Sequence, residues 1–121
     1  MKQKILIADD DGSVREALKL ILGESYELVL VENGEEALSK LKQQQFDLIL
    51  LDIKMPKLDG LEVLKRIKSD GIKSPVLVLT AYQSVEFAKE AVKLGASNYL
   101  PKPFEREQVL SAIRDAFANK H

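Results

Sequence analysis

The stretch Leu48-Ile49-Leu50-Leu51-Asp52 decides the fold, because an uninterrupted apolar run ends there in an acid. A strand with one exposed face alternates apolar and polar residues, whereas a strand buried on both faces is apolar throughout. The same pattern recurs at Ile5–Ala8, which Asp9 follows, and at Val76–Leu79, which Thr80 follows. These runs predict strands of a parallel sheet that is covered on both faces.

Segments with apolar residues at helical spacing separate the strands. Weaker strands are expected at Leu28–Val31 and Asn98–Leu100, and Asn33, Asp59 and Ser84 are placed to cap the helices between them. Parallel strands need crossover connections, and right-handed crossovers put helices on both faces of a sheet. We therefore expect a single domain over residues 1–121, with an α/β fold in which a five-stranded parallel sheet is doubly wound as (βα)5.

Composition excludes several classes of protein. The chain has no cysteine, so disulfides and thiolate metal sites are ruled out. Its net charge is −1 and it has no basic stripe, which argues against direct contact with nucleic acid. The apolar run near the start, Ile5–Ala8, is too short for a signal peptide or a membrane span. We expect a cytoplasmic protein with no membrane partner.

The residues that end the strands carry the chemistry. Ligands of open α/β sheets bind beyond the carboxyl ends of the strands, where Asp9–Asp11, Asp52, Thr80 and Lys102 should meet. Carboxylates without histidine or cysteine suit Mg²⁺. A carboxylate can attack phosphorus and form an acyl phosphate, while a lysine and a metal neutralise the transferred group. This pattern predicts Mg²⁺-dependent phosphoryl transfer.

Each of these residues has a plainer interpretation when it is taken alone. Asp9–Asp11 could only cap a helix, Asp52 could be a loop acid, Thr80 a strand-end hydroxyl and Lys102 a solvated lysine. Their common position at the ends of separate predicted strands favours a shared site.

Four segments carry a family resemblance: ILIADDD (5–11), ILLDIKMPKLDG (49–60), VLVLTAY (76–82) and GASNYLPKPF (95–104). In this order and spacing the chain resembles, over essentially its whole length, the CheY-like receiver domains of bacterial two-component response regulators. The resemblance implies the flavodoxin-like strand order 2-1-3-4-5. It also implies a switch that works through phosphorylation.

The resemblance assigns the metal and acceptor residues. Asp52 matches the phosphoaccepting aspartate. Asp9 and Asp10 match the acidic pair, with Asp10 the direct ligand of Mg²⁺ and Asp9 acting largely through water. Lys54 matches the position whose backbone carbonyl binds the metal, for which Mn²⁺ can substitute. Asp11 lies outside that pair and is interpreted as the local helix cap.

The resemblance also assigns the switch and the structural residues. Thr80 matches the switch hydroxyl, Lys102 the lysine that reaches the phosphoryl group, and Tyr99 the aromatic ring that turns inward. The structural positions are the turn residues Pro56 and Gly60 and the cis peptide bond before Pro103. The glycine would serve either a positive φ or a close approach of backbone.

Two bulky residues indicate a subtype. Lys54 and Tyr82 stand two places past the acceptor and the switch hydroxyl, beside the path of water to the acyl phosphate. The same pairing is similar to the stand-alone receiver of the sporulation phosphorelay, and it suggests slow self-dephosphorylation. The stretch 84–96 is instead similar to receivers of enhancer-binding transcription regulators, and both alternatives stay open.

The resemblance implies partners. A sensor histidine kinase or a histidine phosphotransfer protein would donate the phosphoryl group, since the only histidine, His121, is terminal and interpreted as inert. A downstream output domain or protein would read the surface of the fourth helix, fifth strand and fifth helix. The protein is expected to be a monomer or a weak phosphorylation-dependent dimer.

Two other functions are less compatible with the sequence. A phosphatase of the haloacid dehalogenase type needs a second acid two places after its nucleophile, where this chain has Lys54. A phosphorylation-independent binding module on the same fold would lack a key site residue, and none is missing. We therefore expect no enzyme beyond the chain's own phosphotransfer and slow autodephosphorylation.

Overall fold

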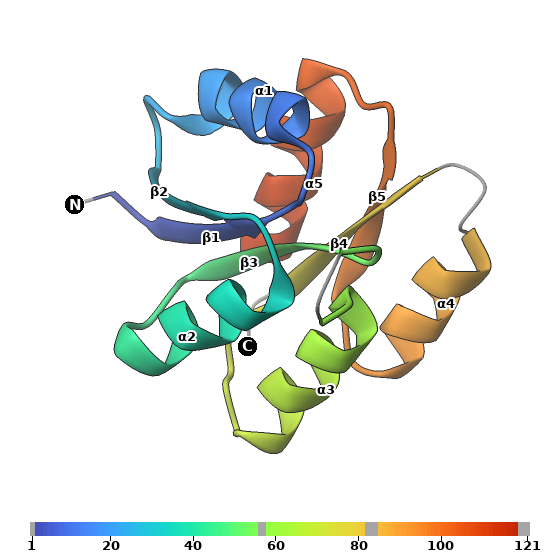
Figure 1. The fold of residues 1–121 in the computed structure, drawn as a ribbon. Coiled ribbons are helices and arrows are strands. Elements are labelled where there is room, and N and C mark those ends of the chain that lie inside the picture. The colour runs from blue at the N-terminus through green and yellow to red at the C-terminus, as the bar shows by residue number, and fades with distance from the viewer. Residues whose placement is uncertain (1, 56–57, 82–84, 119–121) are drawn as a thin grey trace.

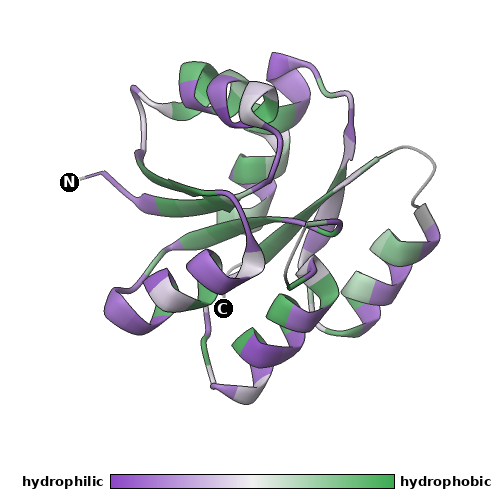
Figure 2. Ribbon diagram, viewed as in Figure 1, coloured by the Kyte–Doolittle hydropathy of each residue, from purple (hydrophilic) through white to green (hydrophobic). Residues whose placement is uncertain are grey.

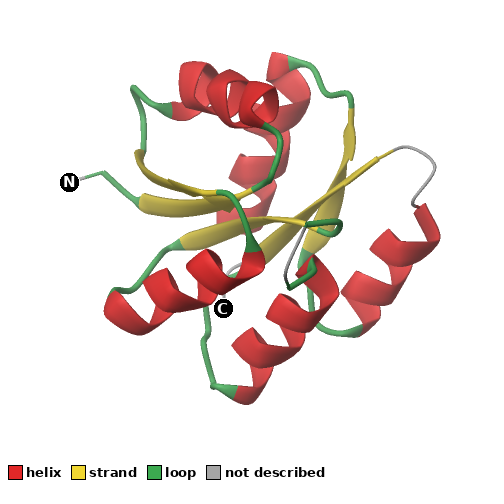
Figure 3. Ribbon diagram, in the orientation of Figure 1, coloured by secondary structure: helices red, strands yellow, loops and turns green. Residues whose placement is uncertain are grey.

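The computed structural model describes residues 2–55, 58–81 and 85–118, in which strands and helices alternate along the chain (Figure 1; Figure 3). The strands are β1 (Lys4–Ala8), β2 (Glu27–Val31), β3 (Leu48–Asp52), β4 (Val76–Ala81) and β5 (Asn98–Lys102). The helices are α1 (Gly12–Leu22), α2 (Gly34–Gln43), α3 (Gly60–Ser69), α4 (Val85–Lys93) and α5 (Arg106–Ala118). Pro56, Tyr82, Ser84 and His121, which the sequence singled out, lie outside the described residues.

The strands form one parallel sheet in the order β2-β1-β3-β4-β5, which confirms the expected order. Every residue of β3 is buried, and β1 and β4 are buried except at one end. The strands at the centre of Figure 2 are accordingly apolar along their length, whereas the helices are apolar on one side only. The uninterrupted apolar runs were therefore correctly interpreted as strands with two buried faces.

Two apolar layers cover the sheet. Helices α1 and α5 pack on one face, against side chains such as Leu50 and Leu77. Helices α2, α3 and α4 pack on the other face, against Leu51 and Val78 (Figure 1). Neighbouring residues of one strand thus belong to different layers, as the pleat of a strand requires. Among the described residues, no helix combines the length and the apolar character that crossing a membrane demands.

Side-chain caps start three helices where the sequence predicts them. The side-chain oxygens of Asp11, Asn33 and Asp59 accept backbone hydrogen bonds from the first turns of α1, α2 and α3. A second side chain supports the start of α2. The Glu36 carboxylate accepts from the backbone N–H of Glu32, at 3.1 Å, which lies one residue before the cap.

Two strands extend further than their apolar runs. Strand β4 continues through Thr80 to Ala81, and β5 continues to Lys102, because Thr80 pairs with Pro101 and Ala81 pairs with Lys102. Thr80 is therefore a residue of β4, as expected of a strand that ends there, whereas Lys102 is a strand residue rather than one that follows β5. An apolar run reports burial, and backbone pairing can continue beyond it.

Gly60 resolves the alternative that the sequence left open. A Cβ atom at this position would lie 2.7 Å from the Cα of Ile53, and nearer still to the carbonyl oxygen of Asp52. The backbone N–H of Gly60 donates to the Ile53 carbonyl at 2.7 Å. A close approach of two backbone segments therefore requires this glycine, while positive φ angles occur at Gly71 and Gly95.

Candidate functional site

The acids lie at the point where the strand order reverses. From β1 the chain runs first to β2 on one side and later to β3 on the other, so the ends of β1 and β3 flank this switch point. Asp9 directly follows β1, and Asp52 is the last residue of β3. Open α/β sheets bind their ligands at such a point.

Strand pleating brings three charged side chains to one face. Residues two apart in a strand share a face, so Asp52 lies on the same face as Leu50, and Lys102 on the same face as Leu100. This is the α1 and α5 side, on which Asp9, two residues after Ile7, also lies. In register, Lys102 is the partner of Ala81 on β4. The small alanine side chain leaves room for the lysine to extend across β4 toward the acids of β1 and β3.

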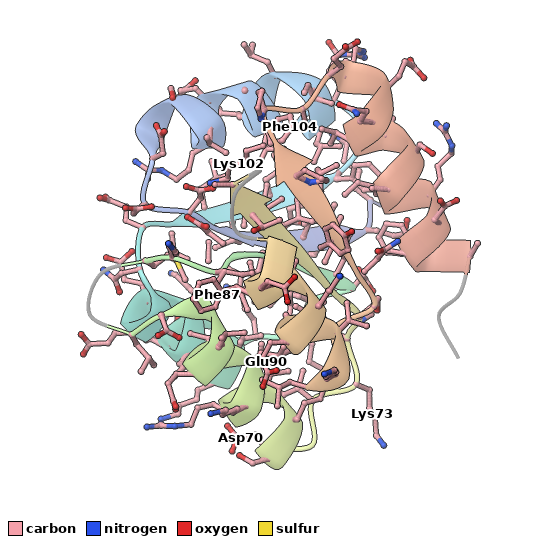
Figure 4. All side chains as sticks on the ribbon, turned by 90° about the vertical axis from the view of Figure 1, so that its right-hand side faces the viewer. Asp70, Lys73, Phe87, Glu90, Lys102 and Phe104 are labelled. Atoms are coloured by element: carbon pink, nitrogen blue, oxygen red, sulfur yellow. The ribbon has the colours of Figure 1, made fainter. Side chains whose placement is uncertain are left out.

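Lys102 forms ion pairs with both carboxylates. Its Nζ lies 2.7 Å from Oδ2 of Asp9 and 3.4 Å from Oδ2 of Asp52. Asp9 has no exposed surface and Asp52 is 5% exposed, so solvent screens these charges little. Figure 4 shows Lys102 at the end of β5. The predicted lysine thus reaches the predicted acceptor.

The peptide bond between Lys102 and Pro103 is cis, as the resemblance implied.

The remaining contacts fix Asp9 in place. Its Oδ1 accepts from the backbone N–H of Asp11 at 2.9 Å, and its carbonyl oxygen accepts from Nη1 of Arg15 at 2.7 Å. Within the described residues, the buried Oδ2 has no regular hydrogen bond, although the ammonium of Lys102 lies beside it. That oxygen keeps acceptor capacity for a further cation or for water.

Burial changes the acidity of Asp52. Removal from water and the nearby Asp9 carboxylate raise the pKa of Asp52 to about 7, against the lowering effects of Lys102 and of the Lys54 backbone N–H. Burial by itself would lower the pKa of Lys102, but the adjacent Asp9 carboxylate and the charge of Asp52 outweigh burial and raise that pKa. The lysine therefore remains a cation while Asp52 titrates near neutrality.

The donor set fits a hard divalent cation. Carboxylate oxygens of Asp9, Asp10 and Asp52 lie within 4.8 Å of one another. Two of these acids, Asp9 and Asp52, are buried, and Asp10 is exposed. Ligands that are all oxygen, with one face open to water, suit Mg²⁺. The backbone N–H of Lys54 donates to Oδ1 of Asp52 at 3.2 Å, so this peptide also borders the site.

A small pocket of about 260 Å³ opens above these groups. Its lining includes Asp10, Asp52, Lys54, Thr80 and Lys102. The structure therefore brings the predicted acceptor, one predicted ligand, the switch hydroxyl and the lysine to a single pocket, with room for a phosphoryl group.

The two predicted switch residues face the opposite side of the sheet. Thr80 is buried and lies on the same face of β4 as Val78, two residues earlier, which pairs with Tyr99 of β5. Both side chains therefore project toward the layer of α3 and α4, and Tyr99 packs there half-buried. The Thr80 hydroxyl donates to the Ala81 carbonyl at 3.2 Å.

Two side chains at this site had no signal in the sequence. Arg15 of α1 was not singled out, yet its guanidinium donates a hydrogen bond to the backbone carbonyl of Asp9. Phe87 of α4 was not singled out, yet it is 47% exposed and contacts the ammonium of Lys54. A helical pattern does not report contacts with a loop from elsewhere in the chain.

The fold and site define a phosphorylation-dependent signalling domain, and a family comparison agrees. The family model described as the response regulator receiver domain matches residues 5–114. The chain belongs to this family, the receiver domains of two-component response regulators.

Named relatives include longer regulators. The chain is 43% identical over 115 residues to the response regulator MprA of Mycolicibacterium vanbaalenii, covering 94% of this chain and 50% of that protein. It is 42% identical over 118 residues to the transcriptional regulatory protein ZraR of Escherichia coli, covering 97% of this chain and 27% of ZraR. The chain therefore spans half or less of these curated relatives.

Solved structures share the fold. NtrX from Brucella abortus superposes with a TM-score of 0.93 at 28% identity, covering 99% of this chain and 28% of NtrX. The receiver domain of the Francisella response regulator 1452 gives 0.89 at 31% identity, covering 98% of this chain and 99% of that one.

Proposed function

We propose that Asp52 accepts a phosphoryl group from a phosphohistidine partner in a Mg²⁺-dependent reaction. The observation that carries the proposal is the convergence on one pocket of the buried Asp52 carboxylate, the Lys102 ammonium and two further acids. A carboxylate oxygen attacks phosphorus as the bond from phosphorus to the histidine nitrogen breaks, and the imidazole then takes up a proton.

Each residue has a defined part in this reaction. Asp9, Asp10, Asp52 and the backbone carbonyl of Lys54 would hold Mg²⁺ or Mn²⁺, which supplies positive charge to the phosphoryl oxygens. Lys102 already lies 3.4 Å from the acceptor carboxylate and neutralises the charge that arrives with the phosphoryl group.

A small phosphodonor tests this reaction directly. Incubation with acetyl phosphate and Mg²⁺ should add one phosphoryl mass, and hydroxylamine should remove it because an acyl phosphate is labile to hydroxylamine. Asp52→Asn should take up none. Absence of the adduct in the wild type, or an equal adduct in the variant, would refute the proposal. Steady turnover of a general phosphomonoester would instead identify a phosphatase.

Phosphorylation would be read through Thr80 and Tyr99. The hydroxyl of Thr80 moves toward the phosphoryl group, and the ring of Tyr99 turns into the space released beside it. Their position on one face of the sheet supports this coupling. The change would alter the surface of α4, β5 and α5, which an output domain or protein binds.

Slow self-dephosphorylation is proposed from Lys54 and Tyr82. Lys54 lines the pocket, where a bulky side chain obstructs water, and Tyr82 lies outside the described residues. Lys54→Asn should shorten the lifetime of the adduct, as should Tyr82→Glu. Unchanged lifetimes in both variants would contradict this role.

The wider setting follows the family. We propose that residues 1–121 act as one receiver domain in the cytoplasm, as a monomer or a weak phosphorylation-dependent dimer. A sensor histidine kinase or histidine phosphotransfer protein donates to it, and it makes no direct contact with nucleic acid or membrane. It turns over no external substrate besides its phosphodonor, since Lys54 occupies the place of a phosphatase's second acid.

A further inference from the structure

Lys54 contacts two parts of the molecule. Its backbone N–H donates to Oδ1 of Asp52 at 3.2 Å, whereas its side chain is exposed and carries its Nζ to 5.3 Å from the ring centroid of Phe87. Phe87 belongs to the first turn of α4 and is labelled in Figure 4. One residue therefore links the acceptor carboxylate to a helix of the readout surface.

The two possible partners of the Lys54 ammonium differ in strength. A cation over an exposed aromatic ring gains only about 0.5–1 kcal/mol. A phosphoryl group on Asp52 would bring roughly −1.5 to −2 of charge and several strong acceptor oxygens. Hydrogen bonds between an ammonium and such oxygens are stronger than a cation–π contact on the surface.

The reach of the side chain permits an exchange of partners. The backbone N–H of Lys54 already donates to the acceptor carboxylate, and Lys54 is among the residues that line the same pocket as Asp52. A four-carbon stem with rotatable bonds can turn from α4 toward that pocket without moving the backbone. Lys102 approaches Asp52 from β5, whereas Lys54 follows β3, so the two lysines come from different segments of the chain.

We propose that Phe87 is a positioning residue that holds the Lys54 ammonium on α4 in the unphosphorylated protein and releases it to the phosphoryl oxygens. The inference rests on the proposed role of Asp52 as acceptor. The contact stabilises the unphosphorylated state only, so it opposes the loading of Asp52. Release frees the exposed face of Phe87, and α4 thereby registers phosphorylation independently of Thr80.

The affinity for a phosphoryl analogue measures how strongly the contact between Lys54 and Phe87 opposes the loading of Asp52. Beryllofluoride adds to a carboxylate in the presence of Mg²⁺ without hydrolysis, and fluorine NMR reports the bound species. Phe87→Leu removes the ring and should tighten the apparent affinity roughly two- to fivefold, the equivalent of one exposed cation–π contact. Phe87→Tyr keeps a ring and should bind as the wild type does, and so should Val92→Ala, a control on the same exposed helix.

A double-mutant comparison isolates the pair. In a Lys54→Met background the effect of Phe87→Leu should vanish, because no ammonium remains to be held. Wild-type affinity in Phe87→Leu, weaker binding, or an equal gain in the Lys54→Met background would overturn the inference alone. A wild type that binds no beryllofluoride would overturn the proposed acceptor role, and this inference with it.

Discussion

At Asp52, burial and the Asp9 carboxylate raise the pKa to about 7, and Lys102 only partly offsets them. The folded protein therefore binds the Asp52 proton more tightly than the unfolded chain, whose carboxyl titrates near 3.8. Stability from this group is fully present below about pH 4 and is lost as pH rises toward 7. The site disfavours the ionised Asp52 carboxylate by itself, and a bound divalent cation would compensate its charge.

Asp52→Asn should consequently stabilise the metal-free protein at alkaline pH. We expect its free energy of unfolding at pH 8 to exceed that of the wild type by on the order of 1 to 2 kcal/mol, and the gain to shrink as pH falls from 7 to 4. Urea unfolding in the presence of a chelator measures it. Asp115→Asn, at an exposed aspartate of α5, should stay within about 0.5 kcal/mol at every pH. A gain that is equal at pH 4 and pH 8 would contradict the raised pKa.

Mg²⁺ should stabilise the protein more as pH rises. The ion binds the ionised carboxylates and so competes with the proton on Asp52. The increase in Tm at a fixed millimolar Mg²⁺ concentration should therefore grow from pH 6 to pH 8, and Asp10→Asn should diminish it. A shift that does not depend on pH would argue that the ion binds elsewhere.

Among the elements, α3 begins in close contact with the residues at the end of β3. Gly60 begins α3 while its backbone touches Ile53, just past the acceptor. Asp59 caps the same helix through the Glu62 backbone N–H at 3.0 Å. The start of α3 is thereby held against the segment that carries Asp52, so the geometry of the site depends on how this helix begins.

Gly60→Ala should destabilise the protein by about 1–3 kcal/mol, because an added methyl group would overlap backbone atoms that cannot rotate away. Thermal or urea unfolding measures the loss. Gly12→Ala is the matched control at the start of another helix, since its added methyl would meet only the flexible end of Arg15 at 3.4 Å. Equal stability of the two variants would show that the close approach is not a packing constraint.

Sequence patterns predicted those elements whose signal is local. The apolar runs predicted three buried strands, and their terminal acids predicted the site, because burial and strand ends both leave residue patterns. The ends of β4 and β5 were missed because they depend on pairing between Thr80 and Pro101. The contacts of Arg15 and Phe87 were missed because they join segments that only the tertiary fold brings together.

Across the whole molecule, the sheet separates the site from its readout. The charged site residues project toward the α1 and α5 layer, whereas Thr80 and Tyr99 project toward the α3 and α4 layer. Under the proposed function, a phosphoryl group on Asp52 would act on the α3 and α4 layer through Thr80, which lines the same pocket. The strand β4 is the element common to both sides, since Thr80 lines the pocket and lies in the same strand as Val78, the partner of Tyr99.

Loading of the site should bury the ring of Tyr99. With beryllofluoride and Mg²⁺ bound, nitration of Tyr99 by tetranitromethane should slow several-fold, as read by peptide mass spectrometry. Thr80→Ala should bind the analogue yet nitrate at the unloaded rate, because the hydroxyl that draws the strand toward the site is gone. Tyr26 serves as an internal reference, since it packs against Phe117 on the other side of the sheet. Equal protection in both proteins would exclude Thr80 from the coupling.

The position of the phosphoryl group is the most direct test of the central claim. After incubation with acetyl phosphate and Mg²⁺, borohydride reduction converts an aspartyl phosphate into homoserine, which peptide sequencing by mass spectrometry locates. We expect homoserine at position 52 and at no other aspartate. Homoserine at position 9, 10 or 11 with Asp52 intact would contradict the assignment of Asp52 as the acceptor.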